Sequence, residues 1–186
     1  VTGRYLVAAL DTVSPTQRWV VDTYLSPKGI PVEVVARGSH VPKDAACLLV
    51  QSPNLLGYME DVAAVVEAAH EVGALAVVSV DPISLGLFRP PGDFGADIVV
   101  GEGQSLGNAL NFGGPYLGLF ACRSQYLRQM PGRIVGKTVD THDRPGYVLT
   151  LQTREQHIRR ERATSNICTS ETLVAIAAAV YLAALG

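Results

Sequence analysis

The fold is decided by residues 47–82, which read CLLVQSPNLLGYMEDVAAVVEAAHEVGALAVVSVDP. Two short runs of aliphatic residues, Cys47–Gln51 and Leu75–Val80, are typical of buried strands. Between them, apolar residues recur at the spacing of one helical face, which predicts a helix over Val62–Glu71 that lies on the sheet. These apolar positions are Val62, Val65, Val66 and Ala69. A strand, a helix and a second strand in this order indicate a unit of a parallel sheet.

The same alternation extends through the first half of the chain and predicts an α/β fold, a mostly parallel sheet with flanking helices. Ser14 followed by Pro15 is typical of a helix start, and Gly29 with Pro31 would stop that helix. Residues 122–145 are rich in turn-forming residues, so we expect loops and one short helix there. The other expected strands are Tyr5–Leu10, Val32–Val35, Asp97–Val100 and Tyr116–Ala121, and the last expected helix is Ser170–Leu185.

Composition narrows the class of protein. The 186 residues are 48% hydrophobic and 17% charged, with a formal net charge of −2, so a folded domain is expected and nucleic acid is not an expected partner. The apolar run that ends the sequence is too short and too rich in alanine for a membrane span. Without a secretion signal or anchor, the expected compartment is the cytoplasm. Three cysteines without a paired spacing, and histidines without a ligand spacing, argue against both disulfides and a bound metal.

Two features of the middle of the chain allow a functional and a structural interpretation. The glycines of Gly101–Gly107 suggest a dinucleotide-binding loop, but the last glycine comes one residue late and no helix is expected after it. A loop that lets the backbone approach another segment closely is the favoured interpretation. Asp81 follows a buried strand, where it could pair with the ring nitrogen of a cofactor or simply cap the turn at Pro82. The sequence does not decide between these two roles.

A polar run precedes the last expected helix. Thr164-Ser165-Asn166 brings two hydroxyl groups and an amide to a helix start, where unpaired backbone N–H groups favour an anion such as a phosphate. An extended helix cap is the structural alternative. Cys168 could act as a nucleophile at this position, although a small buried cysteine is the favoured interpretation.

Several long runs resemble the P-protein family of the glycine cleavage system, and in particular subunit 1 of glycine dehydrogenase (decarboxylating). The runs are Asp81–Gly86, Gly95–Gln104, Asn111–Gly118, Gly132–Gly136 and Ala163–Thr169. The resemblance implies that residues 1–186 are part of the large domain of a fold-type-I pyridoxal-phosphate enzyme. It also implies that Thr164, with Ser165 and Asn166 beside it, contacts the cofactor phosphate of a neighbouring subunit.

The resemblance further implies that this chain lacks the Schiff-base lysine. The family's catalytic subunit has a His-Lys pair between a Gly-Ala-Asp strand and a glycine-rich loop, and the aligned pair here is Gln104-Ser105. A serine cannot form an imine with pyridoxal phosphate. The expectation is therefore a chain without catalytic residues of its own, which supports a cofactor that the partner subunit holds covalently.

The function implied by the resemblance is that of a subunit of glycine decarboxylase. The complex would decarboxylate glycine and pass the remaining aminomethyl group to the lipoyl arm of H-protein. The expected partners are a lysine-bearing second P-protein subunit, lipoylated H-protein and glycine. Two alternatives stay open: the amino-terminal half of a single-chain P-protein, and a nucleotide-binding domain that uses Gly101–Gly107. A subunit with only a scaffolding role is a third.

Overall fold

The computed structural model describes residues 1–114, 116–151, 155–163 and 171–185. These residues form two compact units. The larger unit contains residues 2–123 and 171–185, and the smaller one contains residue 1 and the described residues between 124 and 163. Expected sites at Thr164–Asn166 and Cys168 lie outside the described residues.

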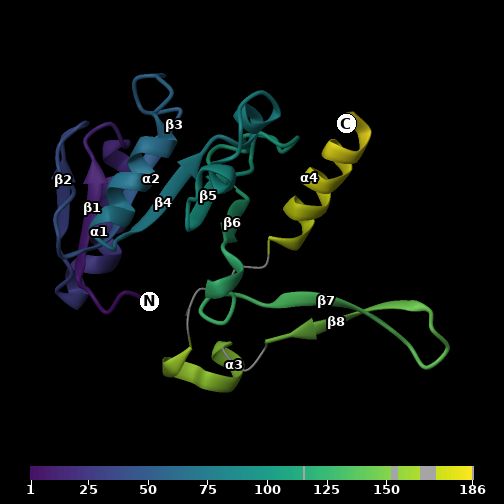
Figure 1. Ribbon diagram of the computed structural model, residues 1–186. Helices are drawn as coiled ribbons and strands as arrows, with labels where there is room; N and C mark the ends of the chain where they lie inside the picture. The colour runs from purple at the N-terminus through teal and green to yellow at the C-terminus, as the bar shows by residue number, and fades with distance from the viewer. Residues whose placement is uncertain (115, 152–154, 164–170, 186) are drawn as a thin grey trace. The chain divides into compact units, whose positions relative to one another are not determined.

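A six-stranded sheet is the centre of the larger unit (Figure 1). Its order is β2-β1-β3-β4-β5-β6, in which the first five strands are parallel and β6 runs antiparallel to β5. The strands are β1 (Leu6–Leu10), β2 (Val32–Val35), β3 (Ala45–Ser52), β4 (Leu75–Val80), β5 (Ile98–Glu102) and β6 (Gly118–Cys122). This confirms the mostly parallel α/β sheet.

Helices cover both faces of the sheet. Consecutive side chains of a strand point to opposite sides, so neighbouring residues of β3 face different helices. Leu48 of β3 contributes to the surface beside α2 (Val62–Glu71), whereas Leu49 contributes to the surface beside α1 (Pro15–Leu25). The central strands are therefore buried on both faces, as a parallel sheet requires. The side chains of Leu48, Val50 and Val78 are fully buried there.

Local signals place both helices where the sequence predicted them. Pro15 is the first residue of α1, although the Ser14 hydroxyl makes no capping hydrogen bond. Instead the Ser14 backbone N–H donates to Oε1 of Gln51 over 2.8 Å. Asp61 caps α2 by accepting a hydrogen bond from the Ala64 backbone N–H. Gly29, in the left-handed region, ends the 3₁₀ turn Ser26–Lys28 that follows α1.

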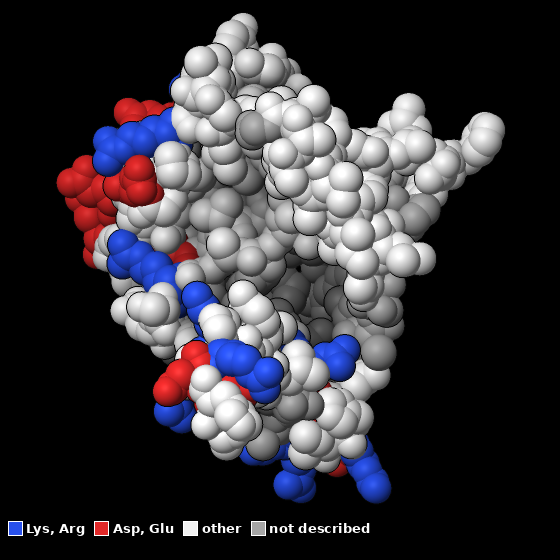
Figure 2. Space-filling view, turned by 90° about the vertical axis from the view of Figure 1, so that its right-hand side faces the viewer, with Lys and Arg blue, Asp and Glu red and all other residues white. Residues whose placement is uncertain are grey.

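The helix α4 (Thr172–Leu185) packs against the end of the sheet next to β6. Ala178, with Val174 and Tyr181, contacts Leu106 and Leu117. Five larger apolar side chains of α4 are exposed: Leu173, Ile176, Val180, Leu182 and Leu185. Figure 2 shows the side of the molecule on which α4 lies, and the surface at the height of α4 is uncharged apart from its left margin. Among the described residues, no helix is long and apolar enough to cross a membrane.

The smaller unit contains an antiparallel hairpin that the sequence analysis did not predict. Its strands are β7 (Ile134–Val139) and β8 (Pro145–Thr150), which form a two-stranded sheet of their own. A 3₁₀ turn at Ser124–Tyr126 precedes it, and α3 (Gln156–Arg159) with the 3₁₀ turn Arg160–Arg162 follows. The expectation of loops and one short helix over residues 122–145 is therefore wrong for β7. The β-branched residues Ile134, Val135, Thr138 and Val139 were a strand signal that the abundance of turn residues obscured.

Candidate cofactor edge of the sheet

A group of polar side chains in the larger unit lies at the carboxyl ends of the parallel strands. In an open α/β sheet, ligands bind at this edge because the loops and helix starts there leave polar groups unpaired. A cavity of about 360 Å³ lies at this edge, next to the ends of β3, β4 and β5. Its lining residues are Gln17, Gln51, Pro53, Ser79, Val80, Asp81, Pro82 and Glu102.

Asp81 has the capping role, one of the two that the sequence left open, and its pairing with a cofactor ring nitrogen stays a prediction. One carboxylate oxygen, Oδ1, accepts a hydrogen bond from the Ile83 backbone N–H over 3.0 Å, so the side chain caps the turn Pro82–Gly86. The same exposed side chain lines the cavity. A carboxylate has about four lone-pair directions, so the capping bond leaves capacity for a cation or a pyridinium N–H.

The other walls of the cavity are held by local hydrogen bonds. Gln51 orders the start of α1 through Ser14, and the Gln17 side-chain amide lies 3.4 Å from the Ser79 hydroxyl. Glu102 accepts from the backbone N–H groups of Gln104 and Leu117 over 2.9 and 2.8 Å. Glu102 therefore fixes both ends of the loop between β5 and β6, and it adds a second carboxylate to the cavity.

Pyridoxal phosphate fits this edge in part. Asp81 suits a protonated ring nitrogen, because a carboxylate at the carboxyl end of a strand stabilises that charge. The cavity lining includes no lysine. The chain's lysines lie elsewhere: Lys28 in the turn after α1, Lys43 in the loop before β3, and Lys137 in β7, where the sequence had indicated a loop. Ser105, which is expected to stand in place of the family's Schiff-base lysine, is exposed in a turn after β5. Among the described residues that line this cavity, a carboxylate is present that could pair with the ring nitrogen, and no amine is present that could form an imine.

The loop after β5 does not have the geometry of a dinucleotide site. No helix follows the glycines over the described residues 103–114 and 116–117, and the chain continues into β6. Gly107 has a φ of +84°, and a Cβ placed on it would lie only 2.6 Å from the ring of Tyr181 in α4. The glycine allows close packing between this loop and α4, which supports the structural interpretation.

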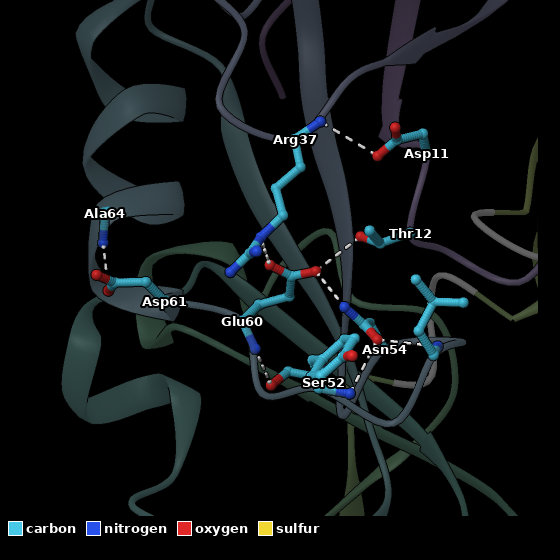
Figure 3. A network of polar contacts seen from close by, with 10 residues as sticks. Asp11, Thr12, Arg37, Ser52, Asn54, Glu60, Asp61 and Ala64 are labelled. Atoms are coloured by element: carbon cyan, nitrogen blue, oxygen red, sulfur yellow. Dashed lines mark hydrogen bonds and ion pairs between the residues drawn. The ribbon is translucent and has the colours of Figure 1, made fainter.

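A second polar cluster at the same edge was missed by the sequence analysis (Figure 3). The Glu60 carboxylate accepts hydrogen bonds from Thr12, Asn54 and Arg37 over 2.8, 2.7 and 2.8 Å. The Glu60 side chain is 1% exposed, whereas that of Arg37 is 57% exposed. The Glu60 backbone N–H also donates to the Ser52 hydroxyl. Three segments that are distant in sequence, at residues 12, 37 and 52–60, are thus connected at one buried carboxylate.

The ionised form of Glu60 is favoured by these contacts. Burial raises the pKa of the carboxyl group, but the hydrogen bonds from Asn54, Thr12 and Arg37 and the charge of Arg37 outweigh burial, so the pKa lies below its usual value. The exposed guanidinium group of Arg37 balances the charge at low desolvation cost. Because every Glu60 contact is internal, we interpret the cluster as a structural support of the edge.

No group of three or more potential metal ligands occurs in the described part of the chain. Burial raises the pKa of the Cys47 thiol to about 11, so this cysteine is protonated and unreactive at neutral pH. Thr164, Ser165 and Asn166 are not described, and their proposed contact with a phosphate stays a prediction.

The sequence matches the family described as "Glycine cleavage system P-protein" over residues 2–186. A relative named "Probable glycine dehydrogenase (decarboxylating) subunit 1" from Desulforamulus reducens is 54% identical over the whole of this chain, which covers 44% of that relative. The relative of the same name from Moorella thermoacetica is 49% identical with the same coverage. The chain therefore spans less than half the length of these relatives.

Solved structures show the same relationship. A crystal structure of glycine decarboxylase (P-protein) of the glycine cleavage system, in inhibitor-bound form, superimposes on the whole chain with a TM-score of 0.94 and 46% identity, over 44% of that protein. A cystathionine gamma-lyase from Lactobacillus plantarum matches 68% of the chain and 34% of its own, with a TM-score of 0.53 and 17% identity, which shows a shared fold alone.

Proposed function

The chain belongs to the P-protein family of the glycine cleavage system, and from this premise we propose that it is part of subunit 1 of a two-subunit glycine dehydrogenase (decarboxylating). The printed name of the relatives, subunit 1, supports an assembly with at least one further subunit. Residues 1–186 belong, in this proposal, to the large domain of the subunit.

The proposed roles of the two subunits rest on one observation. The cavity at the carboxyl edge has a carboxylate suited to a cofactor ring but no amine. Covalent holding of pyridoxal phosphate requires a lysine, so the partner subunit supplies it. Bound pyridoxal phosphate supplies an electron sink that lets the carboxyl group of glycine leave as carbon dioxide.

The residues of this chain would bind and orient the partner's cofactor and would take no part in a covalent step. Thr164, Ser165 and Asn166 would contribute hydroxyl and amide hydrogen bonds to the phosphate of the partner's cofactor. Asp81 and Glu102 would shape the carboxyl edge of the sheet, with any role of Asp81 toward the ring nitrogen secondary. The complete enzyme would transfer the aminomethyl group of glycine to the lipoyl arm of H-protein, and a cytoplasmic location stays a prediction.

Two other functions receive less support. A single-chain P-protein parent would also contain this sequence, but the relatives of which the chain covers 44% are named as separate subunits. A nucleotide-binding domain would need a helix after Gly101–Gly107, and the described residues there contain a turn and a strand instead.

The experiment is to assay glycine decarboxylation with lipoylated H-protein for the full-length subunit, for the lysine-bearing partner and for their mixture. The proposal predicts release of carbon dioxide by the mixture and by neither polypeptide alone. Full activity of the partner without this subunit would contradict the supporting role. Activity of this subunit alone would contradict the absence of a Schiff-base lysine.

A further inference from the structure

The hairpin β7–β8 has two faces of different chemistry. Residues that are paired across the strands point to the same side, so the register assigns every side chain to a face. One face contains Val135 and Leu149, then Lys137 and Tyr147, then Val139 and Pro145. The opposite face contains Ile134 and Thr150, then Gly136 and Val148, then Thr138 and Gly146. We call the first of these the Tyr147 face and the second the Gly136 face.

The Tyr147 face is apolar and exposed. Val135, Val139 and Tyr147 are 59%, 57% and 71% exposed. A two-stranded hairpin is at best marginally stable alone in water, so apolar residues on one face normally require a surface to cover them. The hairpin therefore has the composition of an element whose apolar face is covered by another surface.

The far end of the hairpin is held in a defined shape. Oδ1 of Asp140 accepts hydrogen bonds from the backbone N–H groups of His142 and Arg144 over 2.7 and 3.1 Å. Oδ2 of Asp140 pairs with the Arg144 side chain over 2.8 Å. A hairpin that is ordered before binding loses less conformational entropy when it docks.

Lys137 indicates the chemistry of the covering surface. It lies in the middle of the Tyr147 face, and within the described ranges no carboxylate forms an ion pair with it. A purely apolar surface would bury this ammonium group without a partner, which is costly. A covering surface that is apolar and places a carboxylate opposite Lys137 would avoid this cost.

We propose that the Tyr147 face docks on the lysine-bearing partner subunit, against an apolar patch that contains an acidic side chain. The identity of the partner rests on the proposed function. The relatives' numbered subunit name supplies a second polypeptide of the assembly. In addition, the hairpin and residues 155–163, which lead along the chain to Thr164, belong to one compact unit, so the docking contact continues the proposed cofactor contact.

The test compares valines on the two faces of the hairpin in the full-length subunit. Val135→Ser and Val139→Ser remove apolar surface from the Tyr147 face, and Val148→Ser makes the same change on the Gly136 face. The affinity for the partner subunit is measured by sedimentation, and the stability of each isolated variant by urea unfolding. We expect the Tyr147-face variants to weaken assembly roughly ten- to a hundredfold and Val148→Ser to have little effect. Lys137→Glu should weaken assembly as well, and more strongly at low salt.

The remaining outcomes contradict the proposal in distinct ways. Equal effects of Val135→Ser and Val148→Ser on assembly would mean that the Tyr147 face is not the contact. Loss of stability of the isolated subunit with Val135→Ser alone would show that the subunit's own polypeptide covers this face. Unchanged assembly in all variants would overturn the docking site but leave the proposed function intact. Failure of the wild-type subunit to assemble with the lysine-bearing partner would overturn both.

Discussion

The buried carboxylate of Glu60 accepts hydrogen bonds from three side chains and holds them together. Its donors, Thr12, Arg37 and Asn54, come from three separate connections at the carboxyl edge of the sheet. A buried carboxylate with all its donors in place stabilises that arrangement, whereas a buried donor without an acceptor destabilises it. Glu60 therefore keeps the ends of β1 and β3 in position beside the cavity.

Glu60→Gln should lower the free energy of unfolding of the full-length subunit by about 1–3 kcal/mol, because charge-assisted hydrogen bonds are lost at nearly constant volume. The effect should depend on pH. The folded-state pKa of Glu60 is lowered, so its stabilisation is complete above the unfolded-state pKa and disappears as the pH falls through the folded-state pKa. Urea unfolding at several pH values should show a smaller acid-induced loss of stability for Glu60→Gln than for wild type.

The control for this measurement is Glu67→Gln, because Glu67 is an exposed glutamate on the nearby helix α2. We expect it to change stability by less than about 0.5 kcal/mol. Equal losses for the two variants, or an unchanged pH profile for Glu60→Gln, would contradict the supporting role of the Glu60 cluster.

Thr164 is the residue on which the cofactor proposal depends most. A hydrogen bond to a charged group contributes roughly 1.5–3 kcal/mol, so Thr164→Ala should weaken pyridoxal-phosphate binding by the assembled complex about ten- to a hundredfold. The measurement is a titration of pyridoxal phosphate into complexes whose assembly has been checked by sedimentation. Thr23→Ala, which removes an exposed hydroxyl from α1, is the matched control. Unchanged cofactor affinity with Thr164→Ala would mean that this segment only caps a helix.

At the scale of elements, the sequence predicted the sheet and its helices well. The bounds of α2, β2 and β4 agree with the expectation, and those of the other predicted strands differ by one or two residues, because periodicity and short apolar runs are local signals. The Glu60 cluster could not be predicted, since its donors are brought together only by the strand order. The hairpin could have been predicted from the β-branched and aromatic residues in 134–139 and 147–150 and from the turn residues between these two runs.

The packing of α4 gives a test of one glycine. Gly107→Ala meets two obstacles, a positive φ and the ring of Tyr181. Gly113→Ala meets only the first, because a Cβ at Gly113, with a φ of +108°, has open space around it. We expect Gly107→Ala to destabilise the full-length subunit by about 1–3 kcal/mol more than Gly113→Ala in urea unfolding. Equal losses would show that α4 does not approach this loop as closely as the structure indicates.

At the scale of the molecule, the described residues include a sheet edge with two carboxylates and two separate sets of exposed apolar side chains, one on α4 and one on the Tyr147 face. The exposed side chains of α4 and the Tyr147 face are both explained if further polypeptide packs against them. The relatives are more than twice as long as this chain and are named as subunits, which supports such cover. We predict that α4 is packed on both sides in the complete protein, because its apolar side chains leave almost no polar face.

The central claim is that this subunit supports a cofactor that the partner holds covalently. The direct measurement is borohydride reduction of the assembled complex in the presence of pyridoxal phosphate, followed by peptide mapping by mass spectrometry. We expect a pyridoxyl group on one lysine of the partner subunit and none on Lys28, Lys43 or Lys137. The isolated subunit should likewise yield no stoichiometric adduct. A pyridoxyl group on a unique lysine of this subunit, whose substitution abolishes glycine decarboxylation, would contradict the claim.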